Sequence, residues 1–139
     1  MSTRASSLPT ASANASTSAS ATGTPLVMQL IVDGSSSTLT WPKGPLMAQS
    51  AHAAISAIQI SLSSPLTQTY VSPSNLGLMH KVVLQTPASG KAKMDLHELS
   101  AKLTEARKPE NVPTCLAIAP NSKPAALKKI LRPCTLLKD

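Results

Sequence analysis

The chain has 139 residues, enough for one domain of modest size, and its only aromatic residues are Trp41 and Tyr70. Its 13 basic and 6 acidic residues give a formal net charge of +7, which favours a polyanionic partner. Cys115 and Cys134 have no metal-binding spacing, and no apolar run reaches the roughly 18 residues of a membrane helix. The sequence therefore argues against a metal centre, a disulfide framework and a membrane span.

Residues 1–24 are expected to form a disordered tail. They are almost entirely Ser, Thr and Ala, and carry too little large apolar surface to offset the entropy lost on ordering. The single charged residue, Arg4, cannot form the basic face of a mitochondrial transit peptide. We therefore expect a cytoplasmic protein, with a mitochondrial location as the alternative, and a globular domain over residues 25–139.

The first half of this domain predicts one strand and one helix. Residues 26–32 are apolar except for Gln29 and partly β-branched, as in a strand that is buried on both faces. Gly34 and the serines after it end this strand. Pro45 suits the first turn of a helix, and apolar residues recur at helical spacing over 47–58. Residues 61–75 are polar and interrupted by prolines, which predicts a loop or a short irregular helix.

The second half continues the alternation of strands and helices. A second strand is predicted within 80–85, and Asp95 and Glu98 have the spacing of a capping box at a helix start. Residues 115–119 predict a third strand, and Pro124 opens a last helix. The resulting order β-α-β-α-β-α predicts an α/β layer fold of three to four strands, with crossovers that permit parallel pairing.

Two stretches carry recognisable motifs. The helix start reads Lys-Gly-Pro-Leu-Met-Ala-Gln-Ser-Ala-His-Ala-Ala over residues 43–54, and the third strand reads Thr-Cys-Leu-Ala-Ile-Ala-Pro over 114–120. Both resemble the type 2 peptidyl-tRNA hydrolases, which have Gly-Lys-x-Ala-x-Gln-x-x-His-Ala and Thr-x-Leu-x-Ile-x-Pro at these places. Trp41-Pro42 and residues 109–111 resemble the branch of peptidyl-tRNA hydrolase domain-containing proteins.

The resemblance implies a fold, a reaction and a partner. It implies a small mixed sheet with helices on its faces, and hydrolysis of the ester that joins a peptide to the 3′ ribose of tRNA, in translation quality control. This hydrolysis needs an activated water, stabilisation of an oxyanion and a proton for the leaving hydroxyl, and no cofactor or metal is implied. The implied catalytic positions are Gln49, His52 and Thr114. The implied partner is tRNA, no membrane is involved, and the oligomeric state stays open, a dimer included.

Two departures from the family motifs bear on catalysis. The family's lysine, four residues before the Gln and implied to be catalytic, is replaced here by Pro45, while Lys43 is two residues away. The family's Asp-Ala-Gly-x-Thr segment is replaced by residues 107–111, in which Glu110 is a candidate carboxylate.

The segment 104–113 is too short for the strand that the family places there. It is polar and split by Pro109, whereas a strand needs about 5 residues and a turn at each end. We therefore expect that an edge or central strand is missing, either from the protein or because the sequence comes from an incomplete gene model or splice form. Loss of a central strand would destabilise the domain.

Each site residue also has an ordinary structural interpretation. His52 suits a general base or its partner, and equally a packed or hydrogen-bonded histidine. Gln49 resembles any helical glutamine, and Thr114 resembles a threonine chosen for its β-propensity. Ser50 lies two residues from His52 and points to another face, so a Ser–His nucleophile pair is rejected.

Basic residues fall into two sets. Those predicted to line an RNA path near the site are Lys43, Lys81, Lys91 and Lys93. Those on or near the last helix are Lys123, Lys128, Lys129 and Arg132. Any one lysine is more often a solubilising surface residue than a ligand contact, and two aromatics offer little base stacking. Recognition of RNA is therefore expected through backbone and shape.

Two functions from different classes follow. The first is a cofactor-independent peptidyl-tRNA hydrolase, which the spacing of Gln49 and His52 favours. The second is a catalytically impaired module on the same fold that binds tRNA or a protein, which Pro45 favours.

Overall fold

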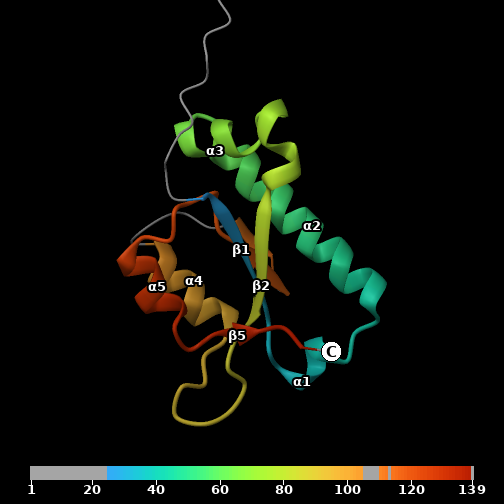
Figure 1. Cartoon of the computed structure of the whole chain (residues 1–139). Coiled ribbons are helices and arrows are strands. Elements are labelled where there is room, and N and C mark those ends of the chain that lie inside the picture. Colours follow the sequence, from blue (N-terminus) through green and yellow to red (C-terminus); the bar gives the residue numbers. More distant parts are fainter. Residues whose placement is uncertain (1–24, 105–109, 113, 139) are drawn as a thin grey trace, which may run out of the picture.

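The computed structural model describes residues 25–104, 110–112 and 114–138, without the side chains of residues 104 and 110–112 (Figure 1). The predicted disordered tail, residues 1–24, lies outside the described residues. The elements in chain order are β1 (Val27–Val32), α1 (Ser36–Leu39), α2 (Lys43–Ile60), α3 (Pro65–Tyr70), the 3-10 helix η1 (Pro73–Leu78), β2 (His80–Gln85), α4 (Leu96–Thr104), β3 (Glu110–Val112), β4 (Cys115–Ala117), α5 (Ala125–Leu131) and β5 (Thr135–Leu136).

The sheet is mixed, and its strand order is β3-β4-β1-β2-β5. The central strand β1 pairs with β2 in parallel, from Val27 opposite His80 to Val32 opposite Gln85. Strand β4 runs antiparallel to β1, and the two-residue β5 runs antiparallel to β2. The α/β fold class, the mixed sheet and the alternation of strands and helices are confirmed.

The expectation that no strand forms between residues 104 and 113 is wrong. Strand β3 (Glu110–Val112) pairs antiparallel with β4, with Val112 opposite Cys115. It lies at the edge of the sheet and pairs with a neighbour on one side only. Three residues are enough to form such a strand, so the expected minimum of about 5 residues was too long for this position. The hypothesis of a lost strand therefore has no support in this structure.

Smaller elements also differ from the prediction. The serines after β1 include the one-turn helix α1, which was not predicted. Of the two alternatives predicted for the polar segment after α2, a loop or a short irregular helix, the structure has the helical one, as α3 and η1. The third predicted strand ends at Ala117, two residues early. The capping box is confirmed, because the Glu98 N–H donates to Asp95 Oδ1 (2.8 Å) and the Asp95 N–H donates to Glu98 Oε2 (3.3 Å).

The fold has three layers, with helices on both faces of the sheet (Figure 1). On one face α2 and α3 cover the sheet, and alanines bring α2 close to the strands; the buried residues there are Met28, Leu30, Val32, Ala53, Ala57, Tyr70, Cys115 and Ala117. On the other face lie α4 and α5; the buried residues are Ile31, Met94, Leu96, Leu99, Leu103, Leu116, Ile118, Leu127 and Leu131. Alternate residues of β1 therefore serve two separate cores, as expected for a strand covered on both faces.

Candidate active site

The carboxyl end of β1 joins three parts of the chain. The Asp33 N–H donates to the Thr114 carbonyl oxygen (3.1 Å), and the Thr86 N–H donates to the Val32 carbonyl oxygen (3.1 Å). The Gly34 N–H donates to Thr86 Oγ1 (2.9 Å), and a β-carbon at Gly34 would overlap the Thr86 carbonyl oxygen. Crevices at the carboxyl ends of strands are the usual ligand sites of α/β sheets. The turn before β4, which carries Thr114, and the turn that leads to α2 meet at this end.

Asp33 is fixed in place by its own turn. Its carboxylate accepts hydrogen bonds from the Ser35 hydroxyl (2.7 Å), the Ser35 N–H (3.1 Å) and the Thr38 hydroxyl (2.8 Å). Partial burial would raise the pKa of Asp33, but these three donors outweigh it and hold the pKa below its ordinary value. Asp33 is therefore an ionised structural group that orders the approach to α1.

Thr114 has an unusual environment for a hydroxyl group. Its side chain is 9% exposed, and within the described residues its Oγ1 is buried with no hydrogen-bond partner. A buried polar atom without a partner is unfavourable and calls for an explanation, such as a ligand or water that supplies the missing bond. Thr114 thus has a feature that its interpretation as an ordinary strand former does not account for.

Helix α2 places the two other motif residues on different sides. Ser50 is half-buried on the side of α2 that faces β4, where its side chain interacts with that of Cys115, and its hydroxyl donates to the Leu46 carbonyl oxygen (3.0 Å). His52 follows Ser50 by about 200° around the helix axis, so it lies on the side away from β4, and it is exposed. Gln49 lies on the flank of the helix and is half-buried. The structure therefore does not bring His52 to Thr114.

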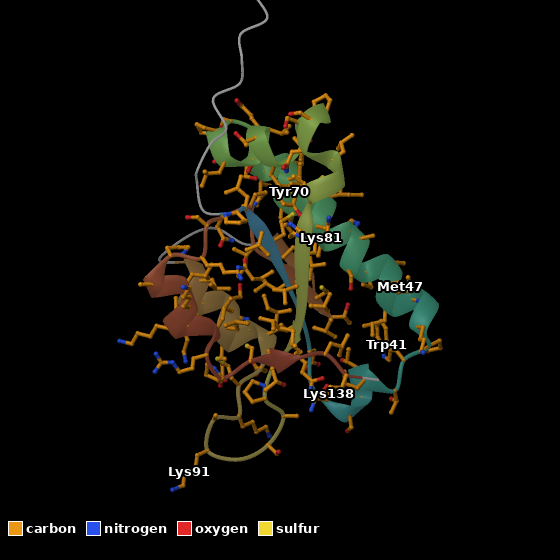
Figure 2. The ribbon with its side chains drawn as sticks, viewed as in Figure 1. Trp41, Met47, Tyr70, Lys81, Lys91 and Lys138 are labelled. Carbon is orange, nitrogen blue, oxygen red and sulfur yellow. The ribbon has the colours of Figure 1, made fainter. Side chains whose placement is uncertain are left out.

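A groove lies where α2 begins. It has a volume of about 440 Å³ and is lined by Leu39, Trp41, Lys43, Leu46, Met47, Leu137 and Lys138. Figure 2 shows Trp41, Met47 and Lys138 at this end of the molecule. Trp41 is 39% exposed and Met47 is 71% exposed, so the groove offers an apolar surface between two ammonium groups. We call this the Trp41 groove.

The other lysines predicted for an RNA path lie elsewhere. Lys81 is near the amino end of β2, where its Nζ donates to the Met79 carbonyl oxygen (3.1 Å) and lies 5.6 Å from the centre of the Tyr70 ring. Lys91 lies on the loop between β2 and α4 (Figure 2). Lys93 lines a separate pocket of about 350 Å³ that also contains Asp33. None of these three lysines lines the Trp41 groove.

Glu110 begins β3, opposite Ala117 of β4, and its side chain lies outside the described residues. Pro45 is exposed in the first turn of α2. No group of three or more His, Cys, Asp or Glu side chains in the described part of the chain is placed to hold a metal ion. None of its helices is both long and apolar enough to cross a membrane.

Sequence reasoning missed the Trp41 groove. Trp41 was used only as a sign of the family branch that the sequence resembles. It is, however, the only tryptophan in the chain, and it lies two residues before Lys43, which was predicted to contact RNA. The combination of an aromatic residue, a proline and a lysine at the start of a predicted helix could have indicated a binding surface there. The contribution of Leu137 and Lys138 could not be predicted, because it depends on where the chain returns after α5.

Comparisons with known proteins give a consistent result. A family model described as peptidyl-tRNA hydrolase PTH2 matches residues 26–137. Two mammalian proteins, both named "Putative peptidyl-tRNA hydrolase PTRHD1", align over 104 residues. The human protein is 36% identical and the mouse protein 35%, and each alignment covers 70% of this chain and 73% of the relative.

Proposed function

Because this chain belongs to the peptidyl-tRNA hydrolase PTH2 family, we propose that it hydrolyses the ester between a peptide and the 3′ ribose of tRNA. The observation that carries the proposal is the extent of the family match, residues 26–137. That range includes the whole of α2, with Gln49, and the turn before β4, with Thr114. Both sequence motifs therefore lie within the range that the family model matches.

The Trp41 groove is the part of the surface best suited to the 3′ end of tRNA. Its volume of about 440 Å³ lies within the roughly 300–1,000 Å³ that is usual for small-ligand pockets. The exposed face of Trp41 can stack on an unpaired base, and Lys43 and Lys138 can contact phosphates. The tRNA end would then lie along the start of α2, close to the position of the family lysine.

In this reaction water attacks the ester carbonyl carbon, and the bond between that carbon and the ribose 3′ oxygen then breaks. The 3′ oxygen takes up a proton and leaves as the ribose hydroxyl, and the peptide is released with a free carboxylate. Lys43 can place its ammonium beside the carbonyl oxygen on which negative charge develops. Thr114 and Gln49 can hold the substrate or the attacking water by hydrogen bonds. We assign His52 to contact with RNA, because it lies on the side of α2 away from β4, and we keep Glu110 as the candidate base.

The test is release of labelled peptide from an N-blocked aminoacyl-tRNA. Replacing Lys43 with Gln should lower kcat/KM about 100-fold, since one oxyanion-stabilising group is lost. The matched control, Lys129→Gln, removes the same charge from an exposed site on α5 and should leave kcat/KM unchanged. His52→Ala should lower it less than about threefold. A complete loss in His52→Ala with little effect in Lys43→Gln would reverse the assignment of these two residues.

A second candidate function is a tRNA-binding module without catalysis. The presence of Pro45, which has no amine, at the position of the family lysine favours it. In that case a folded wild-type protein would bind tRNA with an affinity that falls as salt rises, and would release no peptide. Pro45→Lys should then give measurable peptide release with little change in tRNA affinity, which would show that only the reacting group was lost.

A further inference from the structure

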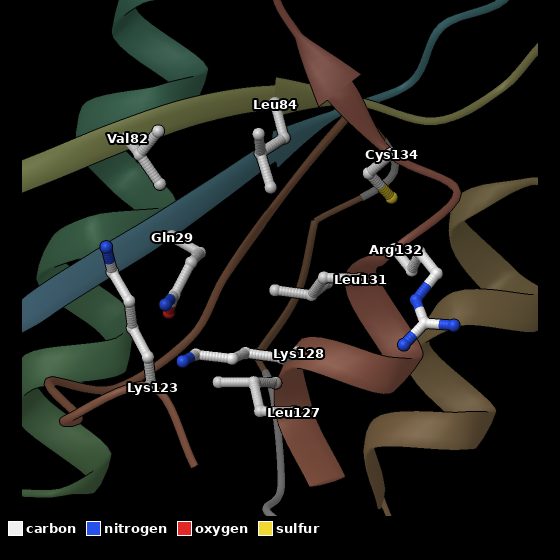
Figure 3. Close-up of a pocket in the computed structure, with 9 residues that line it drawn as sticks. All are labelled: Gln29, Val82, Leu84, Lys123, Leu127, Lys128, Leu131, Arg132 and Cys134. Atoms are coloured by element: carbon white, nitrogen blue, oxygen red, sulfur yellow. The ribbon is translucent and has the colours of Figure 1, made fainter. Parts of the chain in front are cut away.

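Another pocket lies on the opposite face of the sheet from α2, between β2 and α5 (Figure 3). Its volume is about 280 Å³, and its apolar walls include Leu84 of β2 and Leu127 of α5. The pocket exists because α4 and α5 cover β1 and β4 more fully than β2. Residues 82–85 of β2 are only half-buried, whereas every residue of β1 is buried. We call it the α5 pocket.

The floor of the α5 pocket carries a fixed amide group. Gln29 is 4% exposed, and its side chain exchanges two hydrogen bonds with that of Asn121, at 2.7 and 3.3 Å. Asn121 Nδ2 also donates to the Ala119 carbonyl oxygen, and Asn121 Oδ1 accepts from the Lys123 N–H. Only one of the two N–H groups of Gln29 Nε2 has a partner among the described residues. The second N–H is therefore free to donate to a ligand.

The rim of the α5 pocket is cationic. Lys123, Lys128 and Arg132 line it, and no acidic side chain does. None of these three has an ion pair within the described part of the chain. In the view of Figure 3 the Lys128 side chain points toward the Gln29 amide, Lys123 lies at the same end of the pocket, and Arg132 points away from the amide. Lys123 adopts a left-handed backbone conformation (φ 58°), and its N–H is held by Asn121.

We propose that the α5 pocket binds a small organic phosphate. The phosphate would lie between the Lys123 and Lys128 ammonium groups, because charge-assisted hydrogen bonds to phosphate are strong. It would also accept a hydrogen bond from the second N–H of Gln29. The apolar part of the ligand would pack against Leu84 and Leu127. A volume near the lower end of known ligand pockets suits a molecule no larger than a mononucleotide. The site is on the other face of the sheet from α2 and does not depend on the proposed hydrolase activity.

Cys134 gives a direct readout of the occupied pocket. It lines the α5 pocket and is half-buried, whereas the only other cysteine, Cys115, is fully buried in the opposite core. Neutral iodoacetamide should therefore alkylate Cys134 in the folded full-length protein and leave Cys115 unreacted. A ligand in the α5 pocket should slow this alkylation in proportion to its occupancy.

The experiment measures the rate of Cys134 alkylation against increasing inorganic phosphate, butyl phosphate or tRNA. Butyl phosphate should protect Cys134 at lower concentration than inorganic phosphate, because it also uses the apolar wall. Lys128→Gln should weaken protection about tenfold, the loss of one charge-assisted contact. Its matched control, Lys129→Gln, removes a neighbouring charge that does not line the pocket and should leave protection unchanged.

Three results would overturn the proposal. The first is that butyl phosphate does not protect Cys134 from alkylation. The second is an equal loss of protection in the Lys128 and Lys129 variants, which would indicate that phosphate responds to the overall positive charge of α5 and not to a site. The third is protection by tRNA alone, which would make the α5 pocket a part of an RNA surface instead.

Discussion

The two ends of strand β1 are both rich in polar groups, but they are built in different ways. Near the amino end, Gln29 and Asn121 exchange two hydrogen bonds that link β1 to the segment after β4. At the carboxyl end, Asp33 is fully bonded within its own turn, while Thr114 has a buried hydroxyl without a partner in the described residues. At one end a pair of side-chain amides is held by mutual hydrogen bonds, and at the other a buried hydroxyl lies beside a backbone junction with no partner among the described residues. Loss of the first kind of contact should therefore cost stability, whereas removal of the hydroxyl at the second should not.

The largest effect expected at either end is that of Gly34→Ala. A β-carbon at this position overlaps the Thr86 carbonyl oxygen, so β1 and the end of β2 must move apart. We expect a loss of about 3 kcal/mol in the free energy of unfolding, measured by urea denaturation. The matched control is Gly44→Ala in the first turn of α2, where nothing lies within 4 Å, and it should be neutral or stabilising. Equal effects of the two variants would contradict the close approach at Gly34.

At the amino end, Gln29→Met should cost about 2 kcal/mol in the free energy of unfolding. The change keeps the volume of the side chain but leaves the buried Asn121 amide with unmade hydrogen bonds. Gln59→Met, on the exposed side of α2, is the control and should change stability by less than about 0.5 kcal/mol. A neutral Gln29→Met would show that water replaces the lost amide.

At the carboxyl end, Thr114→Val should have the opposite sign. It replaces a buried hydroxyl without a partner by a methyl group, so the free energy of unfolding should rise by about 1 kcal/mol. Turnover of peptidyl-tRNA should fall at the same time if the hydroxyl contacts the substrate. Thr135→Val, on the exposed strand β5, should alter neither quantity. A destabilised Thr114→Val would indicate that the hydroxyl has a partner in the folded protein.

The smallest effect is the pH dependence that arises from Asp33. Because its folded-state pKa is lowered, its contribution to stability is present above the ordinary value of 3.8 and is lost as the pH falls through the folded value. Asp33→Asn should therefore make the unfolding midpoint less sensitive to pH below about 4. Ser35→Ala, which removes one of the donors, should reduce the sensitivity by a smaller amount. An unchanged acid profile in Asp33→Asn would contradict this assignment.

The sequence predicted the family and the main elements because both depend on local patterns. The motifs around Gln49 and Thr114 identified the family that the comparisons confirm, and the capping box of α4 was correct in detail. Strand β3 was missed because a three-residue edge strand has no periodicity of its own. The Gln29–Asn121 pair was missed because its members are 92 positions apart in the chain.

The prediction of the site was less complete than that of the fold. Lysines were grouped by charge alone, and the parallel pairing of β1 with β2 places Lys81 at the opposite end of the sheet from Thr114. The orientation of His52 followed from helix geometry only after the sheet-facing side of α2 was known. The roles of Gln49, His52, Thr114 and Glu110, the cytoplasmic location and the oligomeric state stay predictions.

The single tryptophan and single tyrosine lie at opposite ends of the molecule, with Trp41 half-exposed at the start of α2 and Tyr70 buried against its other end (Figure 2). Each ring therefore reports on its own surroundings. Trp41 can be excited alone at the long-wavelength edge of its absorption, and Tyr70 can be followed by the difference between emission excited at shorter and at longer wavelength. Coincident loss of both signals during denaturation would indicate that the groove and the α3 end unfold as one cooperative unit. An earlier change at Trp41 would indicate that the groove loosens while the core stays folded, which is the mobility that a bulky RNA substrate would exploit.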